Sequence, residues 1–291
     1  MITKSYIQRI KANISIYAGK KTANILEGKY KSIFKGKEMD FEDLREYVVG
    51  DDIKDIDWKS SARSGNVLIK RSHAAKKHNI MFVLDTGKKM TAHTQAAELK
   101  GTVALMTMGT IGYVAHNNGD YVGAIYGKDN SYAMNPLKCG LFNLEKILQT
   151  YERDMDHSSV SIENVLGHIC DTQKRKMILF VITDLDGMEG VEEHTLMKLS
   201  HFHDVLFVNI SDMDITGLNA YDMDHNRYVP NLIANDPKLK ELEQQIKNDI
   251  LTACANKLKR HRISTITIST IQEIPHKTIE LLERHKNANI R

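Results

Sequence analysis

Two continuous runs of apolar residues, each ending in an aspartate, constrain the fold of this chain most strongly. The first run, 79–85, reads NIMFVLD, and the second, 177–184, reads MILFVITD. Strands that are apolar at every position are typical of a parallel sheet covered by helices on both faces. We therefore expect both runs to be central strands of one such sheet.

Segments with helical and strand-like patterns alternate around these two runs. Further strands are expected at 67–69, 121–126, 205–210 and 263–268, and helices at 6–17, 94–116, 144–153, 160–171, 189–200, 237–260 and from about 275. This alternation predicts an α/β fold with a doubly wound, mostly parallel sheet. Ligands of such sheets bind at the carboxyl ends of the strands, so Asp85 and Asp184 are expected to meet at one edge.

Charge and cysteine content exclude several classes of protein. The 40 basic and 37 acidic side chains nearly cancel, which is not the pattern of a nucleic-acid binder. Cys139, Cys170 and Cys254 lie far apart without a CxxC pair, which favours free thiols in a reducing compartment. No stretch resembles a signal peptide or reaches the length of a membrane-spanning helix, so we expect a cytoplasmic protein without a membrane span.

The block 41–63, FEDLREYVVGDDIKDIDWKSSAR, contains an acidic residue before LREY, followed by GDD, IDW and SAR. It closely resembles the signature of the domain-of-unknown-function 58 family. The signature positions in this chain are Arg45, Tyr47, Gly50, Asp51, Asp52, Asp57, Trp58, Ser61 and Arg63. The resemblance implies an N-terminal helix and signature segment over 1–76, followed by a von Willebrand factor A-like domain over 77–291.

The resemblance also implies a function and a partner. Members of this family accompany MoxR-type AAA+ ATPases and are thought to serve as their adapters. Many members carry membrane helices before the signature, and this chain resembles the short soluble form. We therefore expect a non-enzymatic protein-binding module whose partner is a MoxR-type ATPase.

The signature block is rich in charge and allows three interpretations. Its carboxylates and cations are Asp51, Asp52, Asp55 and Asp57 with Arg45, Lys54, Lys59 and Arg63. They predict an ion-pair and capping network that fixes the block against the sheet, with Trp58 as its apolar anchor. An Arg, Asp and Trp patch also suits a protein interface. The third interpretation is a metal-dependent hydrolase using the cluster Asp51–Asp57, although the block lacks a nearby His pair or a phosphate-binding glycine loop.

Von Willebrand factor A domains often bind a divalent cation through an Asp-x-Ser-x-Ser loop. Here that loop begins at Asp85, and the two Ser positions are Gly87 and Lys89, which supply no oxygen side chain. Asp85 and Asp184 remain as hard ligands that Mg²⁺ accepts. We expect a degenerate, metal-free site in which Lys89 neutralises both aspartates. The alternative is a Mg²⁺- or Mn²⁺-dependent protein-binding A domain.

Overall fold

A six-stranded sheet forms the centre of the molecule in the computed structural model. The structure describes residues 5–35, 43–71, 77–155, 160–214, 216, 221–222, 227–228 and 236–289. The strand order is β10-β7-β6-β3-β4-β5. The strands are β3 (Asn79–Leu84), β4 (Tyr121–Lys128), β5 (Ser131–Lys138), β6 (Ile178–Thr183), β7 (Asp204–Ile210) and β10 (Ser264–Ile268).

The sheet is parallel except at one edge, which confirms the predicted fold class. β10, β7, β6, β3 and β4 pair in parallel, whereas β5 pairs antiparallel with β4. The two apolar runs of the sequence are the neighbouring central strands β3 and β6, paired with Leu84 opposite Ile182. Their carboxyl ends therefore lie side by side.

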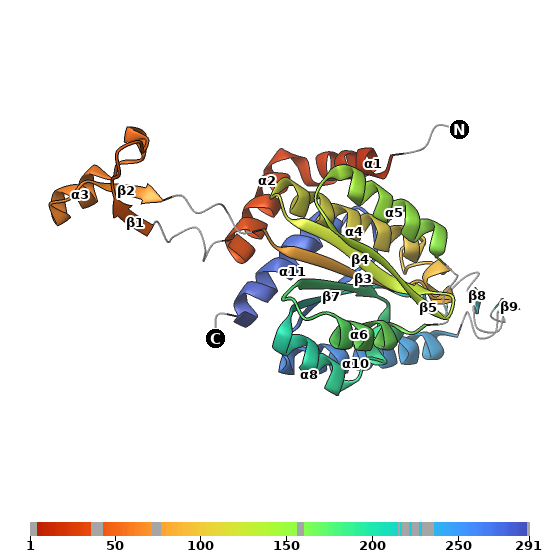
Figure 1. The fold of residues 1–291 in the computed structure, drawn as a ribbon. Coiled ribbons are helices and arrows are strands. Elements are labelled where there is room, and N and C mark those ends of the chain that lie inside the picture. The colour runs from red at the N-terminus through yellow and green to blue at the C-terminus, as the bar shows by residue number, and fades with distance from the viewer. Residues whose placement is uncertain are drawn as a thin grey trace.

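Helices cover both faces of the sheet (Figure 1). One face carries α1 (Tyr6–Asn13), α2 (Gly19–Tyr30), α4 (Lys100–Asn117), α5 (Leu141–Asp154) and α11 (Ile274–Asn289). The other carries α6 (Ile162–Thr172), α7 (Leu185–Glu189), α8 (Glu193–Phe202) and α10 (Pro237–Arg260). Successive side chains of β3 join opposite cores, with Phe82 in the first and Val83 in the second. This is why a continuous apolar run is needed in a strand covered on both sides.

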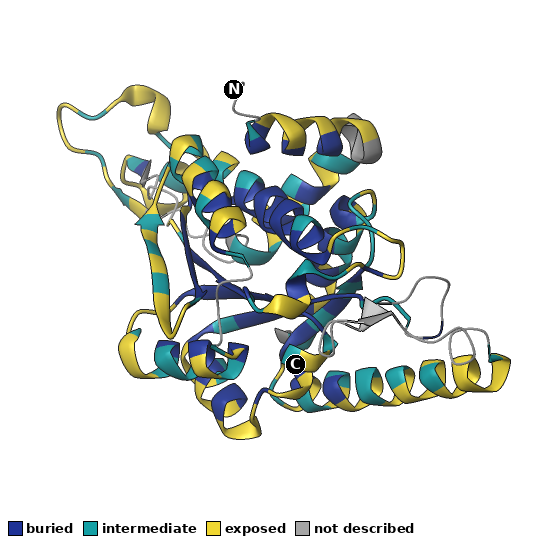
Figure 2. Ribbon diagram, turned by 90° about the vertical axis from the view of Figure 1, so that its right-hand side faces the viewer, coloured by how far each residue is buried: buried dark blue, intermediate teal, exposed yellow. Residues whose placement is uncertain are grey.

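Burial follows these layers. Figure 2 shows buried residues along the sheet and the facing helices, while the long helix α10 has an exposed outer side. α4 is buried over most of its length, because it lies between the sheet and the outer helices of that face. No helix in the described ranges combines the length and the apolar character that a bilayer span requires.

The first helices pack into the same core as the sheet. Ile10 of α1 and Tyr30 of α2 are buried there, and the Glu145 carboxylate accepts hydrogen bonds of 2.9 Å from the backbone N–H groups of Tyr6 and Ile7. Two π-helical turns, η1 (Ile14–Ala18) and η2 (Lys31–Lys35), continue these helices. Whether residues 1–76 fold as a separate domain stays a prediction, but the structure groups 5–35 with the large body.

Residues 43–71 form a small unit that we call the signature unit. It contains β1 (Asp43–Glu46), the 3₁₀ turn η3 (Ile53–Asp55), α3 (Trp58–Ser64) and β2 (Leu68–Arg71), with β1 and β2 paired antiparallel. Figure 1 shows this unit away from the six-stranded sheet. The predicted packing of the signature block against the sheet is therefore wrong. A further short pair, β8 (Tyr221–Asp222) and β9 (Arg227–Tyr228), follows β7.

Candidate functional site

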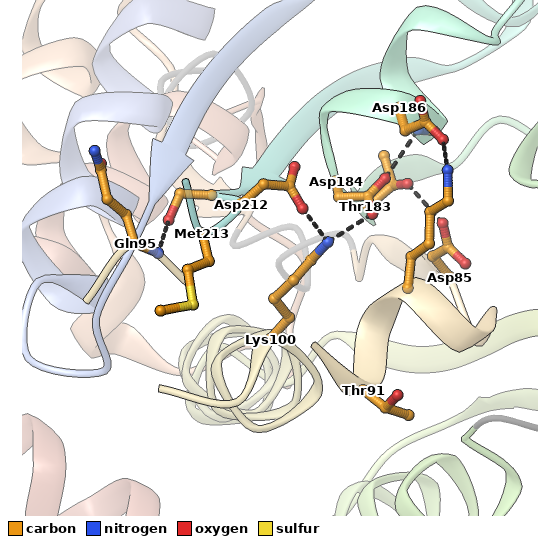
Figure 3. A network of polar contacts seen from close by, with 12 residues as sticks. Asp85, Thr91, Gln95, Lys100, Thr183, Asp184, Asp186, Asp212 and Met213 are labelled. Atoms are coloured by element: carbon orange, nitrogen blue, oxygen red, sulfur yellow. Dashed lines mark hydrogen bonds and ion pairs between the residues drawn. The ribbon is translucent and has the colours of Figure 1, made fainter. Parts of the chain in front are cut away.

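The carboxyl ends of three neighbouring parallel strands bring together a cluster of polar side chains (Figure 3). Asp85 follows β3, Thr183 and Asp184 lie at the end of β6, and Asp212 lies two residues after β7. We call Asp85, Lys100, Thr183, Asp184 and Asp212 the strand-end cluster. Asp85 and Asp184 meet in space because their strands are paired in parallel and in register.

Asp85 is held by one hydrogen bond on each carboxylate oxygen. The Thr183 hydroxyl donates to Oδ2 at 2.8 Å, and the backbone N–H of Gly87 donates to Oδ1 at 2.9 Å. Burial, together with the neighbouring carboxylate of Asp184, raises the pKa of Asp85 above its usual value. Gly87 thus contributes a backbone donor to the loop rather than a side-chain ligand.

Lys100 supplies the positive charge of the cluster. Its Nζ donates to Oδ2 of Asp184 at 2.6 Å and also pairs with Oδ1 of Asp212. The residue is only 1% exposed. Burial by itself lowers the pKa of Lys100, but the two carboxylates outweigh it and the pKa stands above its usual value. Lys100 is therefore an ammonium held between two anions.

The prediction that Lys89 neutralises Asp85 and Asp184 is wrong. Lys89 lies in the 3₁₀ turn η4 (Lys88–Thr91), and its ammonium pairs with the carboxylate of Asp186. This ion pair is at the surface, since the Lys89 side chain is 48% exposed and that of Asp186 is 62% exposed. The helix that was expected to start at residue 94 is α4, and it begins at Lys100, after a loop over 88–99. With this later start, Lys100 lies beside the strand ends and Lys89 does not.

Sequence reasoning missed Lys100 although a signal was present. A cation at the amino end of a helix opposes the helix dipole, and α4 contains no other Lys, Arg, Asp or Glu residue. A lysine in that position needs nearby anions to be stable when buried. The two carboxylates lie 84 and 112 residues further along the chain, so only the fold pairs them with it.

The residues present do not fit the divalent cation that the resemblance implied. A cation bridging Asp184 and Asp212 would lie where the Lys100 ammonium lies, and the two positive charges would repel each other. Within the described residues, no group of three or more His, Cys, Asp or Glu side chains is placed to hold a metal. Asp85 and Asp184 lie together at the strand ends as predicted, but the ammonium of Lys100 already neutralises the carboxylate of Asp184.

The charged residues of the signature unit are used mostly to fix its own backbone. Arg45 forms a bidentate ion pair with Asp51 at 2.8 and 2.6 Å, which lowers the pKa of Asp51. Oδ2 of Asp51 also accepts from the backbone N–H of Val48 at 2.9 Å. Gly50 adopts a φ of +113° in the same turn, a value that favours glycine. These contacts agree with the predicted ion-pair network.

Two further aspartates of the unit are helix caps. Asp52 accepts from the backbone N–H of Lys54 at 3.0 Å, and Asp57 accepts from those of Lys59 and Ser60 at 3.0 Å. Each therefore occupies an N-cap position. The hydroxyl of Ser61 joins α3 to β2, because it donates to Asp57 O at 2.7 Å and accepts from Leu68 N at 2.8 Å.

Other signature positions face outward. Trp58 is 67% exposed, so its predicted role as an apolar anchor is wrong; among residues 44–69, whose burial the structure describes, Ile69 is the buried one. Arg63 is exposed as well, and Tyr47 is half-buried, with its backbone N–H bonded to Val67 O at 2.8 Å. Several large apolar side chains of the unit are exposed; four of them, Val48, Val49, Ile53 and Trp58, are more than 60% exposed, and we call these four residues the apolar patch.

The fold and the strand-end cluster define a doubly wound α/β domain with a small signature unit inserted before its first central strand. The family model described as protein of unknown function DUF58 matches residues 43–219, more than half of the chain. The chain belongs to the DUF58 family, as the signature block predicted.

Solved structures that match include von Willebrand factor A domains. An aerotolerance-related membrane protein from Bacteroides fragilis is 13% identical, with 71% of this chain and 98% of that chain covered and a TM-score of 0.43. A von Willebrand factor type A protein from Catenulispora acidiphila is 9% identical, with 72% and 42% covered and a TM-score of 0.39. Proximal thread matrix protein 1 from the mussel byssus is 12% identical, with 72% and 47% covered and a TM-score of 0.40. The comparison with curated proteins found no match.

Proposed function

We propose that this chain is a non-enzymatic adapter that binds a MoxR-type AAA+ ATPase through its signature unit. The observation that carries the proposal is the apolar patch on that unit. Val49 is 94% exposed and Trp58 67% exposed, and both lie within the residues that the family model matches. Exposed apolar residues in a segment that also carries arginine and aspartate suit a protein interface, where tryptophan contributes more binding energy than most residue types.

The same unit gives little support to catalysis. The carboxylates of Asp52 and Asp57 accept hydrogen bonds from backbone N–H groups at helix starts, and Asp51 is paired with Arg45. A general base needs a free carboxylate within reach of a substrate proton, and a metal ligand needs a free oxygen facing the metal. Capping and ion pairing explain these residue types without either role.

The choice of an ATPase as partner rests on family membership, because the resemblance implies it. A cytoplasmic location belongs to the same proposal. Cys139, Cys170 and Cys254 are free thiols in the structure, which suits a reducing compartment.

Binding to the purified MoxR-type ATPase of the same host tests the proposal directly. The full chain, labelled on surface lysines, is titrated with the ATPase in the presence of ATP, of ADP and of no nucleotide. Saturable binding by the wild type is expected, together with a loss of affinity of at least about tenfold in Trp58→Ala. The matched control is Phe142→Ala, because Phe142 is another exposed aromatic, 86% exposed on α5.

The outcomes separate the parts of the proposal. Equal binding by Trp58→Ala, Phe142→Ala and wild type would mean that the signature unit is not the docking surface. No binding of the wild type in any nucleotide state would overturn the ATPase as the partner. Capture from the host's lysate followed by mass spectrometry would then identify what replaces it.

A further inference from the structure

The strand-end cluster contains an ammonium at the place where a divalent cation would bridge two strands. Oδ2 of Asp184 and Oδ1 of Asp212 both contact Nζ of Lys100, one from the end of β6 and one from the segment after β7 (Figure 3). We propose that Lys100 is a built-in replacement for a divalent cation, and that removing its ammonium converts the cluster into a Mg²⁺ or Mn²⁺ site.

Burial makes this ammonium a fixed part of the fold. Lys100 is 1% exposed, and Asp184 is buried as well, so burying either charge without the other would destabilise the fold. The backbone also fixes its position, because Lys100 N donates to Ala92 O at 2.9 Å. Met213 N donates to His93 O at 3.1 Å and ties the same loop to the segment that carries Asp212.

The charge of the cluster is that expected if the singly charged Lys100 ammonium replaces a doubly charged metal ion. One ammonium faces two carboxylates, and a third, Asp85, lies beside Asp184. An ammonium leaves more negative charge uncompensated than a divalent cation would.

The oxygen atoms left after removal of the ammonium suit a hard cation. Asp184 and Asp212 would ligate it directly, and water would fill the volume of the lost lysine side chain. Mg²⁺ is commonly bound in this way, by one or two carboxylates and several waters. Asp85, which accepts the Thr183 hydroxyl, lies beside Asp184 and would accept hydrogen bonds from those waters.

Partner binding is expected not to depend on a metal ion at the strand-end cluster, and this expectation alone rests on the proposed function. A bound metal ion can offer an open coordination position to a carboxylate of a partner. The Lys100 ammonium is enclosed and engaged by two carboxylates of its own chain. Binding of the partner is therefore expected to be unaffected by EDTA or by added Mg²⁺ that is not needed by the nucleotide.

The test compares wild type, Lys100→Ala, Lys89→Ala and the double variant Lys100→Ala/Asp212→Asn in metal-free buffer and with Mn²⁺ or Mg²⁺. Lys89→Ala is the matched control, because it removes an exposed lysine of the same loop that pairs with Asp186. Mn²⁺ binding is read from the loss of the free-ion electron paramagnetic resonance signal, and melting temperature is measured on the same samples. None of these measurements requires the ATPase.

We expect Lys100→Ala to melt below wild type without metal and to bind one Mn²⁺ at least about tenfold more tightly than wild type. At a concentration about one hundred times the dissociation constant, its melting temperature should rise by about 5 °C. Wild type and Lys89→Ala should show no such rise, and the double variant should lose it because one direct ligand is gone.

Three results would overturn the inference. They are stoichiometric Mn²⁺ binding by wild type, a Lys100→Ala variant that is as stable as wild type in metal-free buffer, and a folded Lys100→Ala variant that binds no metal. If Lys100→Ala does not fold without metal, refolding with and without Mn²⁺ decides the matter. Refolding of Lys100→Ala only in the presence of Mn²⁺ supports the inference. The inference is contradicted if Lys100→Ala refolds in neither buffer while Lys100→Met folds and binds no metal.

Discussion

The hydroxyl of Thr183 donates a hydrogen bond of 2.8 Å to the carboxylate of Asp85 and joins the ends of the two central strands β6 and β3. The same aspartate receives the Gly87 backbone N–H, and its own carbonyl oxygen accepts from the hydroxyl of Tyr151 at 2.8 Å. Two side-chain hydroxyls and one backbone N–H, from three segments of the chain, therefore fix the position of Asp85. This arrangement depends on close backbone approach at the start of α7.

Replacing Gly187 by alanine is expected to break this contact. A Cβ at residue 187 would lie 2.0 Å from Oγ1 of Thr183 and 3.1 Å from Oδ2 of Asp85, so the threonine would have to move. We expect the free energy of unfolding to fall by about 1–3 kcal/mol, as measured by urea denaturation. Gly190→Ala is the control: its Cβ would meet nothing closer than 3.4 Å, and a change within about 0.5 kcal/mol is expected. Equal losses in both variants would contradict the steric explanation.

Asp85→Asn should change the pH dependence of stability. The folded-state pKa of Asp85 is raised above its unfolded value by burial and by Asp184, so ionisation of this group disfavours the folded state as pH rises through that interval. Asparagine stays neutral and can keep an acceptor towards Gly87. We therefore expect the variant to be more stable than wild type at pH 7, with the difference disappearing below the unfolded pKa of about 3.9.

Urea denaturation between pH 3 and pH 8 measures this difference, within the range where both proteins fold reversibly. Asp184→Asn is the informative comparison, since it removes the carboxylate that faces Lys100 and should destabilise at neutral pH. A wild type that is more stable than Asp85→Asn at pH 7 would show that the ionised carboxylate is favoured in the fold.

Much of the fold could be predicted because its central strands are apolar at every position. The neighbouring strands β3 and β6 were recognised from this property, and their parallel register brings Asp85 and Asp184 together. The edge strand β5 was not expected, because its residues are exposed or half-buried and it contains Pro136. An edge strand needs no continuous apolar run, so the sequence carries a weaker signal for it.

For the site, sequence patterns predicted the aspartates at the strand ends but not the lysine that pairs with them. Lys89 lies four residues after Asp85 and was chosen for that reason, but a 3₁₀ turn directs it to Asp186. Lys100 pairs with aspartates that only tertiary structure brings near. Trp58 was predicted to be the apolar anchor of the block against the sheet, yet it is 67% exposed on a small unit with little interior.

Asp57→Ala should loosen α3 without changing the large body. Oδ1 of Asp57 caps the helix by accepting from Lys59 N and Ser60 N, and Gly65 ends it with a φ of +79°. Loss of such a cap costs about 1 kcal/mol, so faster hydrogen exchange is expected at the amides of 58–64, read by mass spectrometry. Asp57→Asn keeps an acceptor and should exchange nearly as slowly as wild type. The hydrolase interpretation requires instead a turnover that is lost in a folded Asp57→Asn variant.

Trp58→Ala should leave stability nearly unchanged, because the side chain is 67% exposed. A change within about 0.5 kcal/mol is expected from urea denaturation, whereas Phe82→Ala, at a fully buried position, should cost about 3–5 kcal/mol.

Trp58 is also the single tryptophan of the chain, so its fluorescence reports on the apolar patch alone. The free protein should emit at long wavelength and be quenched readily by iodide, and the partner should shift the emission to shorter wavelength and protect it when it covers this residue. A tryptophan that is already protected from iodide in the free protein would show that the apolar patch is covered within the chain itself, and the adapter's docking surface would have to be sought at another place.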